Sequence, residues 1–524
     1  MSTKEDEGDS KVEVSIVSDN VETKSHHSRT RKYVPVSSMI SGGGTYHFLP
    51  DKNEGYVPAQ LLEDWSIEKL KALASSTKDK EAVMTQKFLI NGTDEVDVPK
   101  TTSLGQRLTR FNVSPVDDLI SMQETAESFV LNNLASRYHS KDSYTRCGPQ
   151  NLVYVHNSTS KSSSSEEKIS SAREKLEKIP FNFAQYDPDI CAMTHRVYEA
   201  CIEKPKGIEK TEDLDYSIVV SGSKGAGTSV VGSQALRYLY EIGKSTSNAD
   251  VIEKIDLAEH LIRTFAYTDE TNLQFTRVTS VKLNSSGLVG GMNVDCFGLR
   301  HERATHCPKG LRNFEIFYDL FQAPMPKRRR IAAMDTRKFS YLRNTDLNRR
   351  DSDVSHYRKT LDALNKLVGD DEMVFTTVAA ILHIGNVNFV FNETIGAKVI
   401  PSDSVTIAAD LLTVDVEALK QCLCADAEDV NGAMANRDAL ARHMYACLFD
   451  YVLKKINESL SFESPYPSIR VVESPGFAVT SVNRWSDFIS SYYAEIIYRH
   501  YVRSMFVAEQ EFLAKNLYGS DYVL

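Results

Sequence analysis

Residues 215–243 constrain the fold of this chain more than any other segment. DYSIVV (215–220) is an apolar run that predicts a strand, and VVGSQALRYLYEIG (230–243) has the spacing of an amphipathic helix. The loop between them carries glycine at positions 222, 225 and 227. Glycines let main-chain N–H groups turn inward, and the N-terminus of the following helix adds partial positive charge. This order predicts a phosphate cradle in an α/β fold; the alternative is a tight structural turn before a helix.

The loop differs from a working phosphate loop at one position. A working loop reads GxxxxGK followed by Ser or Thr; here Thr228 stands at the lysine position, while Ser229 keeps the hydroxyl that would hold Mg²⁺. The lost lysine hydrogen bond is worth about 1.5–3 kcal/mol, which weakens phosphate binding roughly 10- to 100-fold. Lys224 is either a substitute cation or a lysine that faces solvent. The candidate nucleotide-binding residues are Gly222, Ser223, Lys224, Gly225, Ala226, Gly227, Thr228 and Ser229.

Composition excludes several classes of function. The formal net charge is -10 at pH 7, so the whole chain is not built to coat nucleic acid or an anionic membrane. The eight cysteines are scattered without a CxxC pair, which predicts reduced thiols rather than disulfides or a zinc site. The acidic N-terminus lacks the apolar core of a signal peptide, and no apolar run approaches the roughly 18 residues of a membrane span. We therefore predict a cytoplasmic protein.

The pattern along the chain predicts three parts. Residues 1–50 are polar and predict a disordered tail, because they cannot bury enough apolar surface to offset chain entropy. Residues 51–110 contain β-prone runs at 55–62 and 87–98, the second with an Asn-Gly turn signal, and predict a small all-β module. Residues 111–524 mix amphipathic helices with apolar strands.

Four segments of the third part carry specific predictions. Residues 127–139 have a helical period, 151–156 predict a buried strand, and the polar run 158–168 predicts a surface loop. Residues 485–517 predict one long helical run. Its apolar residues at helical spacing predict a face buried by core packing. These residues are Trp485, Phe488, Tyr492 and Ile496.

Beyond the loop, the order of motifs resembles the motor head of the myosin family. The loop is similar to the myosin sequence GESGAGKT, AAILHIGNVNF (379–389) is close to AGILHLGNIKF, and LRNFEIFYDLF (311–321) resembles ERNFHIFYQLL. Further collinear segments resemble the family at 130–155, 188–200, 437–457 and 504–517. The resemblance implies a P-loop NTPase-type myosin motor core, with a central mixed sheet, flanking long helices and an incomplete lower lobe.

The resemblance also places the two switch segments of the family, and both are altered. Switch I, NxNSSRFGKF in the family, aligns so that Asn272 is followed by Leu273 at a Mg²⁺-binding serine and by Gln274 at the arginine. Switch II, DISGFE in the family, reads ESPGFA here. Its degenerate positions are Glu473, Gly476 and Ala478.

In active myosins the switch arginine and the terminal switch II glutamate form an ion pair that closes the site around the γ-phosphate. Gln274 and Ala478 imply that both partners are absent here. Losing one partner alone would leave an unpaired charge at a cost of about 3–5 kcal/mol, whereas losing both avoids that penalty. The adenine-side sequence NPYK is also replaced, by HNST at 156–159. The resemblance therefore implies that ATP and Mg²⁺ bind weakly or not at all, and that no catalytic residue remains.

Within the family, the SPGF, CGPQNLVYV and GYVPAQLL segments look most like class-XVIII myosins, which are regarded as having weak or no motor ATPase. The resemblance implies actin filaments or other myosin-associated cytoskeletal proteins as partners, and a cytoskeleton-associated location. It implies no nucleic-acid partner, and we see no light-chain sites or coiled coil in the sequence. KRRR (327–330), in a predicted loop, is either a solvated charge run or a contact for an acidic partner. His195 and His383 lie in core segments and predict packed or hydrogen-bonded histidines.

Three functional hypotheses stay open from the sequence. The first is a non-motor, actin- or myosin-associated pseudoenzyme that acts by binding. The second is a weak ATP-binding protein or slow NTPase that uses Lys224. The third is a decayed gene product with little function. Titration with fluorescent ATP, with Lys224→Ala as the variant, separates the first two, and a cooperative melt tests the third.

Overall fold

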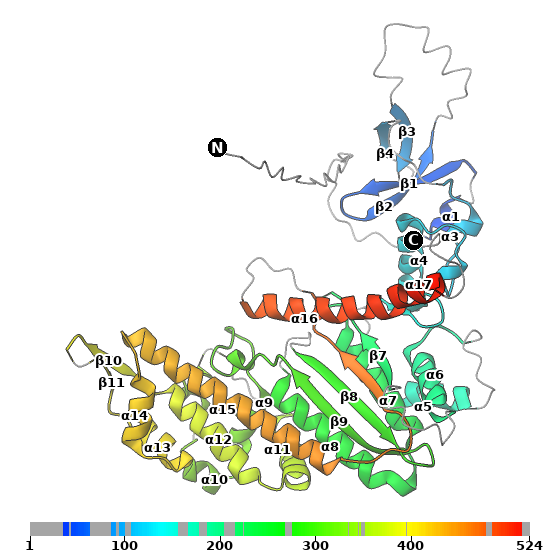
Figure 1. Ribbon diagram of the computed structural model, residues 1–524. Helices are drawn as coiled ribbons and strands as arrows, with labels where there is room; N and C mark the ends of the chain where they lie inside the picture. The colour runs from blue at the N-terminus through cyan, green and yellow to red at the C-terminus, as the bar shows by residue number, and fades with distance from the viewer. Residues whose placement is uncertain are drawn as a thin grey trace, which may run out of the picture. The chain divides into compact units, whose positions relative to one another are not determined.

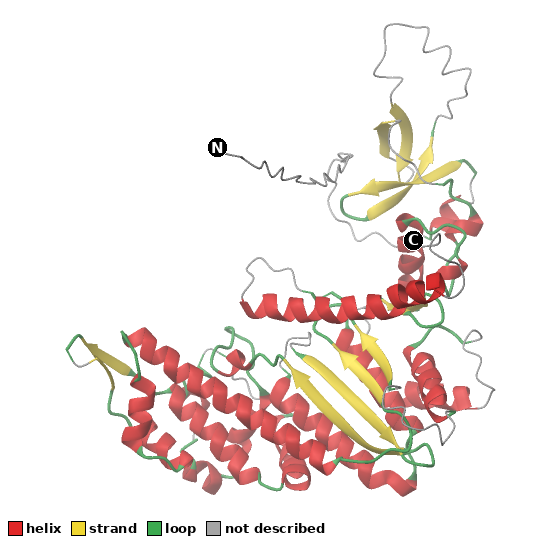
Figure 2. Ribbon diagram, viewed as in Figure 1, coloured by secondary structure: helices red, strands yellow, loops and turns green. Residues whose placement is uncertain are grey.

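The computed structural model describes sixteen stretches of the chain. They are residues 35–40, 43–62, 85–90, 94–99, 106–155, 166–177, 186–203, 215–223, 225–267, 275–333, 335–343, 345–346, 350, 352–394, 396–477 and 485–515. The chain forms two compact units. The first holds Met1–Asn157 with Asp187–Asp189, and the second holds Ser158–Tyr186 with Ile190–Leu524. Figures 1 and 2 show their helices and strands.

The first unit is built on an antiparallel sheet in the order β1-β2-β3-β4. Its strands are β1 (Thr45–Asp51), β2 (Gly55–Leu61), β3 (Thr85–Ile90) and β4 (Asp94–Pro99). In the tight turn after β1, the Asp51 carboxylate accepts hydrogen bonds from the backbone N–H groups of Asn53 and Glu54, at 2.8 and 2.9 Å. The sheet contains both β-prone runs predicted from the sequence, while the Asn-Gly turn lies outside the described residues.

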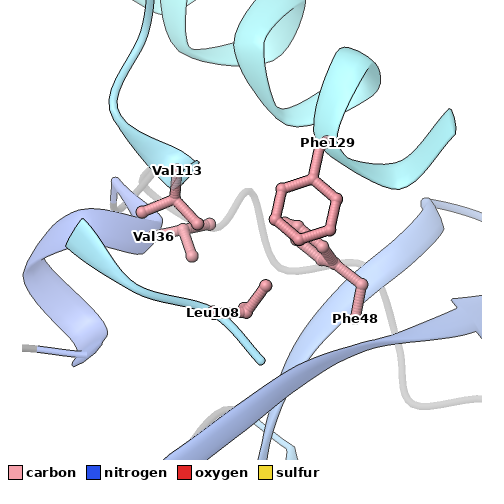
Figure 3. Close-up of a cluster of buried hydrophobic side chains, with 5 residues drawn as sticks. All are labelled: Val36, Phe48, Leu108, Val113 and Phe129. Atoms are coloured by element: carbon pink, nitrogen blue, oxygen red, sulfur yellow. The ribbon is translucent and has the colours of Figure 1, made fainter. Parts of the chain in front are cut away.

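Neighbouring side chains of β1 point to opposite faces of this sheet, so each face acquires its own core. Leu49 belongs to one cluster, which contains Leu49, Ala59, Phe88, Ile90 and Val98. Phe48 belongs to the other, shown in Figure 3, which contains Val36, Phe48, Leu108, Val113 and Phe129. The rings of Phe48 and Phe129 meet edge to face with centroids 5.2 Å apart.

The second cluster explains why two predicted boundaries differ from the structure. The other α-helices and strands that the structure describes in this unit are α1 (Val36–Met39), α3 (Arg110–Val113), α4 (Glu127–His139), β5 (Tyr144–Arg146) and β6 (Leu152–Tyr154). α1 and nearly all of β1 lie in residues 1–50, where a disordered tail was predicted, because Val36 and Phe48 pack in the core. α4, which matches the predicted helix 127–139, carries Phe129 into the same core, so the compact unit continues past residue 110. β6 lies in the predicted strand 151–156 but is half-buried rather than buried.

The second unit is organised around a mixed sheet in the order β7-β12-β8-β9. Its strands are β7 (Tyr216–Val220), β12 (Ile469–Glu473), β8 (Thr276–Leu283) and β9 (Val289–Phe297). β12 runs parallel to β7 and antiparallel to β8, and β9 runs antiparallel to β8. A separate hairpin joins β10 (Phe389–Asn392) to β11 (Gly396–Val399). The mixed sheet with long helices around it (Figure 1) confirms the predicted α/β fold class.

Helices cover this sheet and build the rest of the unit. They are α5 (Glu166–Glu177), α6 (Ile190–Ile202), α7 (Thr228–Ile242), α8 (Ala249–Ala266), α9 (Glu315–Asp319), α10 (Met325–Arg330), α11 (Asp353–Ala363), α12 (Asp371–Gly385), α13 (Asp403–Leu412), α14 (Val416–Cys424), α15 (Val430–Ser459), α16 (Trp485–Val502) and α17 (Ala508–Leu513). α7 packs on β7 and β12, α8 packs on β9 and α11, and α12 packs on α13 and α15. α5 begins inside the predicted loop 158–168, whose earlier residues lie outside the described part.

The face of α16 that was predicted to be buried is exposed. Trp485, Phe488, Tyr492 and Ile496 are 75%, 56%, 55% and 44% exposed, and the first three rings stack along the helix. The buried side instead carries small or polar residues, namely Asp487, Ser491 and Ala494. Arg300 donates a hydrogen bond to Asp487 at 2.8 Å, which holds the helix by its polar side. Helical spacing identified the stripe correctly, but spacing alone does not say which side of a helix faces the core.

The indole of Trp485 provides a direct test of this orientation. In a Trp65→Phe variant, which leaves Trp485 as the only tryptophan of the chain, we expect acrylamide to quench the native fluorescence nearly as strongly as that of the urea-unfolded chain. The reason is that three quarters of the Trp485 side-chain surface is open to solvent. Native fluorescence that resists quenching would instead place the aromatic stripe against another surface.

The basic run KRRR lies in α10, not in the loop that was predicted. Lys327 pairs with Asp371 at 2.5 Å, and Arg330 pairs with Glu372 at 2.5 Å. Both acidic residues lie in the first turn of α12, so half of the basic run is neutralised within the chain. This favours the interpretation of the run as a solvated, internally paired surface.

Two broader expectations can be compared with the structure. None of the eight cysteines forms a disulfide. Among the helices that the structure describes, none is both long and apolar enough to span a bilayer.

Candidate nucleotide site

Three segments that are distant in sequence meet at one edge of the mixed sheet. Because β7 and β12 are parallel, their carboxyl ends lie at the same edge, where Val220 pairs with Glu473. Because β8 is antiparallel to β12, it begins at this edge, and Arg277 pairs with Glu473 across the two strands. The glycine loop, the segment after β12 and the start of β8 therefore converge at these strand ends. Open α/β sheets bind ligands at such a place.

The backbone of the glycine loop has the form of a phosphate cradle. Gly225 and Gly227 have φ angles of 87° and 86°, in the left-handed region that favours glycine, and Gly227 caps the N-terminus of α7. The N–H of Ala226 donates to the carbonyl of Ser223 at 3.0 Å. Ser223 is also bridged to Phe477, which lies after β12. The loop after β7 and the loop after β12 are thus held side by side.

Thr228 and Ser229 form the first turn of α7 and are partly exposed. The first N–H groups of a helix have no partner within the helix and point toward any anion placed at its end. The backbone therefore fits a phosphate group, and the Ser229 hydroxyl is suited to a Mg²⁺ ion. The side chain at position 228 does not fit, because threonine supplies no positive charge. Among the described residues, the backbone of the loop fits a phosphate group, and the side chain at position 228 adds no positive charge to it.

The structure locates only some of the predicted switch residues. Glu473 is fully buried at the end of β12, and Gly476 is half-buried in the loop that follows. The other predicted residues of the site lie outside the described part of the chain, namely Lys224, Asn272, Leu273, Gln274, Ala478 and the segment 156–159. The inferred loss of the family ion pair, and the substitute role of Lys224, remain predictions.

A buried charge cluster beneath the loop was missed by the sequence reasoning. Arg277 is 1% exposed and donates two hydrogen bonds to Glu259 of α8, one of them at 2.8 Å to Oε2. The Nε of Arg277 also lies 4.0 Å from Oε2 of Glu473. Within the part of the chain that the structure describes, neither carboxylate oxygen of Glu473 has a hydrogen-bond partner. Little in the sequence indicated this cluster, because β8 (TRVTSVKL) also carries Lys282 and three hydroxyl side chains.

Burial and charge give the two carboxylates of this cluster different pKa values. Burial raises the pKa of Glu473 to about 7, and Arg277 offsets this only in part. Burial acts on Glu259 in the same direction, but the Arg277 guanidinium outweighs it and holds the pKa of Glu259 below its ordinary value. Burial, reinforced by Glu259, raises the pKa of Tyr240 well above its usual range. Glu259 is therefore the ionised partner of Arg277, and Glu473 titrates near neutrality.

Gly232 of α7 leaves the space that the Glu473 side chain fills. A Cβ atom on Gly232 would lie 2.5 Å from both Cγ and Oε1 of Glu473. Such contacts are far inside normal separations, and Glu473 is fully enclosed, so it cannot move away without disturbing β12. The Glu473 side chain can therefore occupy its position only if residue 232 lacks a side chain.

Gly232→Ala is therefore expected to destabilise the protein by about 1–3 kcal/mol through overpacking, although alanine is intrinsically the better helix former by about 1 kcal/mol. Urea unfolding measures the difference. Gly432→Ala in α15 is the matched control, because its Cβ would meet only ordinary contacts of 3.4 Å or more, and we expect it to be neutral or stabilising. Equal effects of the two substitutions would contradict the contact between Gly232 and Glu473.

His195 and His383 have structural partners, as the sequence predicted. His195 is 4% exposed, and its Nδ1 lies 3.0 Å from the hydroxyl of Tyr238. His383 is also 4% exposed, and its Nε2 lies 3.0 Å from the carbonyl of Ile331. Burial lowers the pKa of both imidazoles. They act in packing and hydrogen bonding between segments of the second unit.

Comparison with known proteins agrees with this geometry. A sequence profile described as myosin head (motor domain) matches residues 116–518. Myosin-3 of Arabidopsis thaliana is 25% identical over 508 residues, which cover 90% of this chain and 42% of that protein. Myosin-13 of the same plant is 27% identical over 430 residues, covering 77% of this chain and 28% of that protein. The chain thus spans less than half the length of these curated relatives.

Proposed function

This chain belongs to the myosin head (motor domain) family, and we propose that it is a non-motor member that acts by binding in the actin cytoskeleton. In this proposal its nucleotide site holds a phosphate-bearing ligand weakly and does not hydrolyse ATP. Actin filaments, or other proteins associated with myosin, are the partners that the family favours. The finer resemblance to class-XVIII myosins fits this proposal and remains a prediction.

The observation that carries the proposal is Thr228 in a loop whose backbone is otherwise preserved. Gly225 and Gly227 keep the left-handed backbone of the cradle, and Ser229 keeps its hydroxyl, so the loop has the shape of a phosphate site. Phosphoryl transfer depends almost entirely on positioned charge, because the protein supplies little covalent chemistry. A cradle without its cation can therefore retain phosphate contact while losing turnover.

The expected size of the loss supports a binding role rather than slow catalysis. Removing one group that stabilises charge in a transition state typically lowers the rate by about 10²–10³-fold. Thr228 removes one such group, and Gln274 and Ala478, at the positions that the family resemblance assigns, would remove two more. Hydrolysis should then fall to background, and the chain's own residues would do no more than hold the ligand.

Co-sedimentation with filamentous actin tests the binding role. We expect the fraction of this protein that pellets with actin to be the same with and without Mg·ATP, because the phosphate cradle lacks the cation through which a triphosphate would act. ATP-induced release from the filaments would contradict a non-motor role, and no pelleting at all would contradict actin as the partner.

A second measurement decides between this proposal and a slow NTPase. Fluorescent ATP should bind weakly, and Lys224→Ala should leave that affinity nearly unchanged. Micromolar binding that is abolished by Lys224→Ala would overturn the proposal in favour of an enzyme or nucleotide sensor.

A further inference from the structure

Two carboxylates share one buried guanidinium under the phosphate loop, while the second nearby cation, Arg263, is exposed. Arg277 lies between Glu259 and Glu473; the side chains of Arg277 and Glu473 are 1% exposed, and that of Glu259 is 18% exposed. If both carboxylates were ionised, Glu473 would hold a negative charge without a hydrogen-bond partner among the described residues and out of reach of water, which is costly. A proton on one carboxylate removes that cost. Glu473 is the acceptor because Glu259 already holds both hydrogen bonds from Arg277.

Glu473 is also in mechanical contact with the cradle. Its carboxylate lies against Gly232, four residues into α7, which is about 6 Å along the helix from Thr228 at 1.5 Å per residue. The next residue, Ser474, donates its N–H to the carbonyl of Val220 at the start of the glycine loop, at 3.4 Å. The bridge between Phe477 and Ser223 completes the connection. Through these contacts, a change in the charge of Glu473 can shift the backbone that would bind phosphate.

We propose that Glu473 is a proton switch beneath the phosphate loop, which takes up a proton when a phosphate-bearing ligand enters the cradle. The inference builds on the nucleotide site of the proposed function. A bound polyanion about one helical turn away disfavours a second negative charge, so it shifts Glu473 toward its neutral form. Protonated Glu473 and bound phosphate then favour each other, because the coupling between two binding events is reciprocal.

The titratable and charged groups that interact with Glu473 come from four of the elements around it: α7, α8, β8 and β9. Arg277 of β8, with Glu259 and Arg263 of α8, contributes the charged groups. The neutral titratable groups that interact with it are Tyr240 of α7, Tyr267 after α8 and Cys296 of β9. Burial raises the pKa of each of these three groups, that of Cys296 to about 12, so none of them titrates near neutral pH.

The first arm of the test needs no ligand. Because the pKa of Glu473 is raised from 4.5 to about 7 in the folded state, the folded protein binds more protons between these values. The contribution of Glu473 to stability therefore falls as pH rises through this window and stays low above it. Relative to Glu473→Gln, the unfolding equilibrium constant of the wild type should rise on the order of 100-fold between pH 5 and pH 8. Glu372→Gln, an exposed and matched substitution, should show no such difference from the wild type.

The second arm measures protons taken up with a ligand. Isothermal titration with ADP at pH 8, in two buffers of different ionisation enthalpy, gives the number of protons bound with the nucleotide. We expect uptake of a fraction of one proton, with affinity rising up to about tenfold per pH unit as pH falls from 8 to 7. Glu473→Gln should remove this uptake, and Glu473→Asp, which keeps an ionisable group, should retain part of it.

The outcomes separate the inference from the function beneath it. A pH-independent difference between wild type and Glu473→Gln would overturn the proton switch. Infrared spectroscopy of the wild type gives a test that does not require any variant to fold. We expect the band of a protonated carboxyl group to disappear between pH 6 and pH 8.5, and a band that persists would also overturn the proton switch. If stability shows the expected pH dependence and ADP binds without proton uptake, Glu473 titrates but is not coupled to the ligand. If ADP gave no binding heat at any pH, the proposed nucleotide site would be contradicted. The pH dependence of stability would still test the titration of Glu473.

Discussion

Arg277→Met is expected to lower the free energy of unfolding by about 3–5 kcal/mol, because it leaves buried carboxylate charge without a partner. Arg277 is 1% exposed and is the cation shared by Glu259 and Glu473. Methionine fills a similar volume, so the loss reports charge rather than a cavity. The shift of the urea-unfolding transition measures it. The effect should be smaller at pH 5 than at pH 8, because Glu473 is neutral at the lower pH.

Two variants make this result specific to the cluster. Arg337→Met is the matched control, since its side chain is 83% exposed, and we expect a change within about 0.5 kcal/mol. Adding Glu259→Gln to Arg277→Met should recover part of the lost stability, because replacing a whole buried pair is often nearly neutral. If the double variant loses as much unfolding free energy as the two single variants together, Arg277 and Glu259 are not coupled.

Thr228→Lys is expected to tighten the binding of Mg·ATP roughly 10- to 100-fold, because it restores a charge-assisted hydrogen bond worth about 1.5–3 kcal/mol. The backbone needed to aim that lysine is present, since Gly227 holds its left-handed conformation directly before it. Titration with a fluorescent ATP analogue measures the change. Hydrolysis should stay at background, because Gln274 and Ala478 still stand at the predicted switch positions.

Thr228→Met is the control for this gain, because it has a long side chain without charge. Equal affinities of the lysine and methionine variants would mean that the loop does not direct position 228 toward phosphate. The loop would then not be a phosphate-binding loop, while the fold and the family assignment would still hold.

The local elements of the fold could be predicted because their patterns are local. The strand at 215–220, the helix at 127–139 and the hairpin strands around residues 87–98 all appear where alternation, helical period or turn residues placed them. The left-handed backbone at Gly225 and Gly227 is likewise a local feature, because glycine allows it within a few residues; phosphate binding by this loop stays a prediction. Sequence alone also indicated the mixed α/β core, through the collinear resemblance to myosin heads.

Features that depend on distant partners could not be predicted in the same way. The aromatic face of α16 has a perfectly regular helical period, yet Arg300 and Asp487 decide that its polar side faces inward. The cluster of Glu259, Arg277 and Glu473 joins α8, β8 and β12, and no spacing within one segment indicates that these three side chains meet. Gly232 lies inside a helical pattern, and nothing in that pattern indicates that the Glu473 side chain packs against it.

Steady release of phosphate from Mg·ATP by the purified chain, with and without actin, tests the central claim most directly. The claim is that the loop retains the backbone of a phosphate cradle without the charge needed for turnover. We predict no release above the buffer blank under either condition. Sustained, multiple-turnover release that is lost in Ser229→Ala would contradict the claim and establish the chain as an active ATPase.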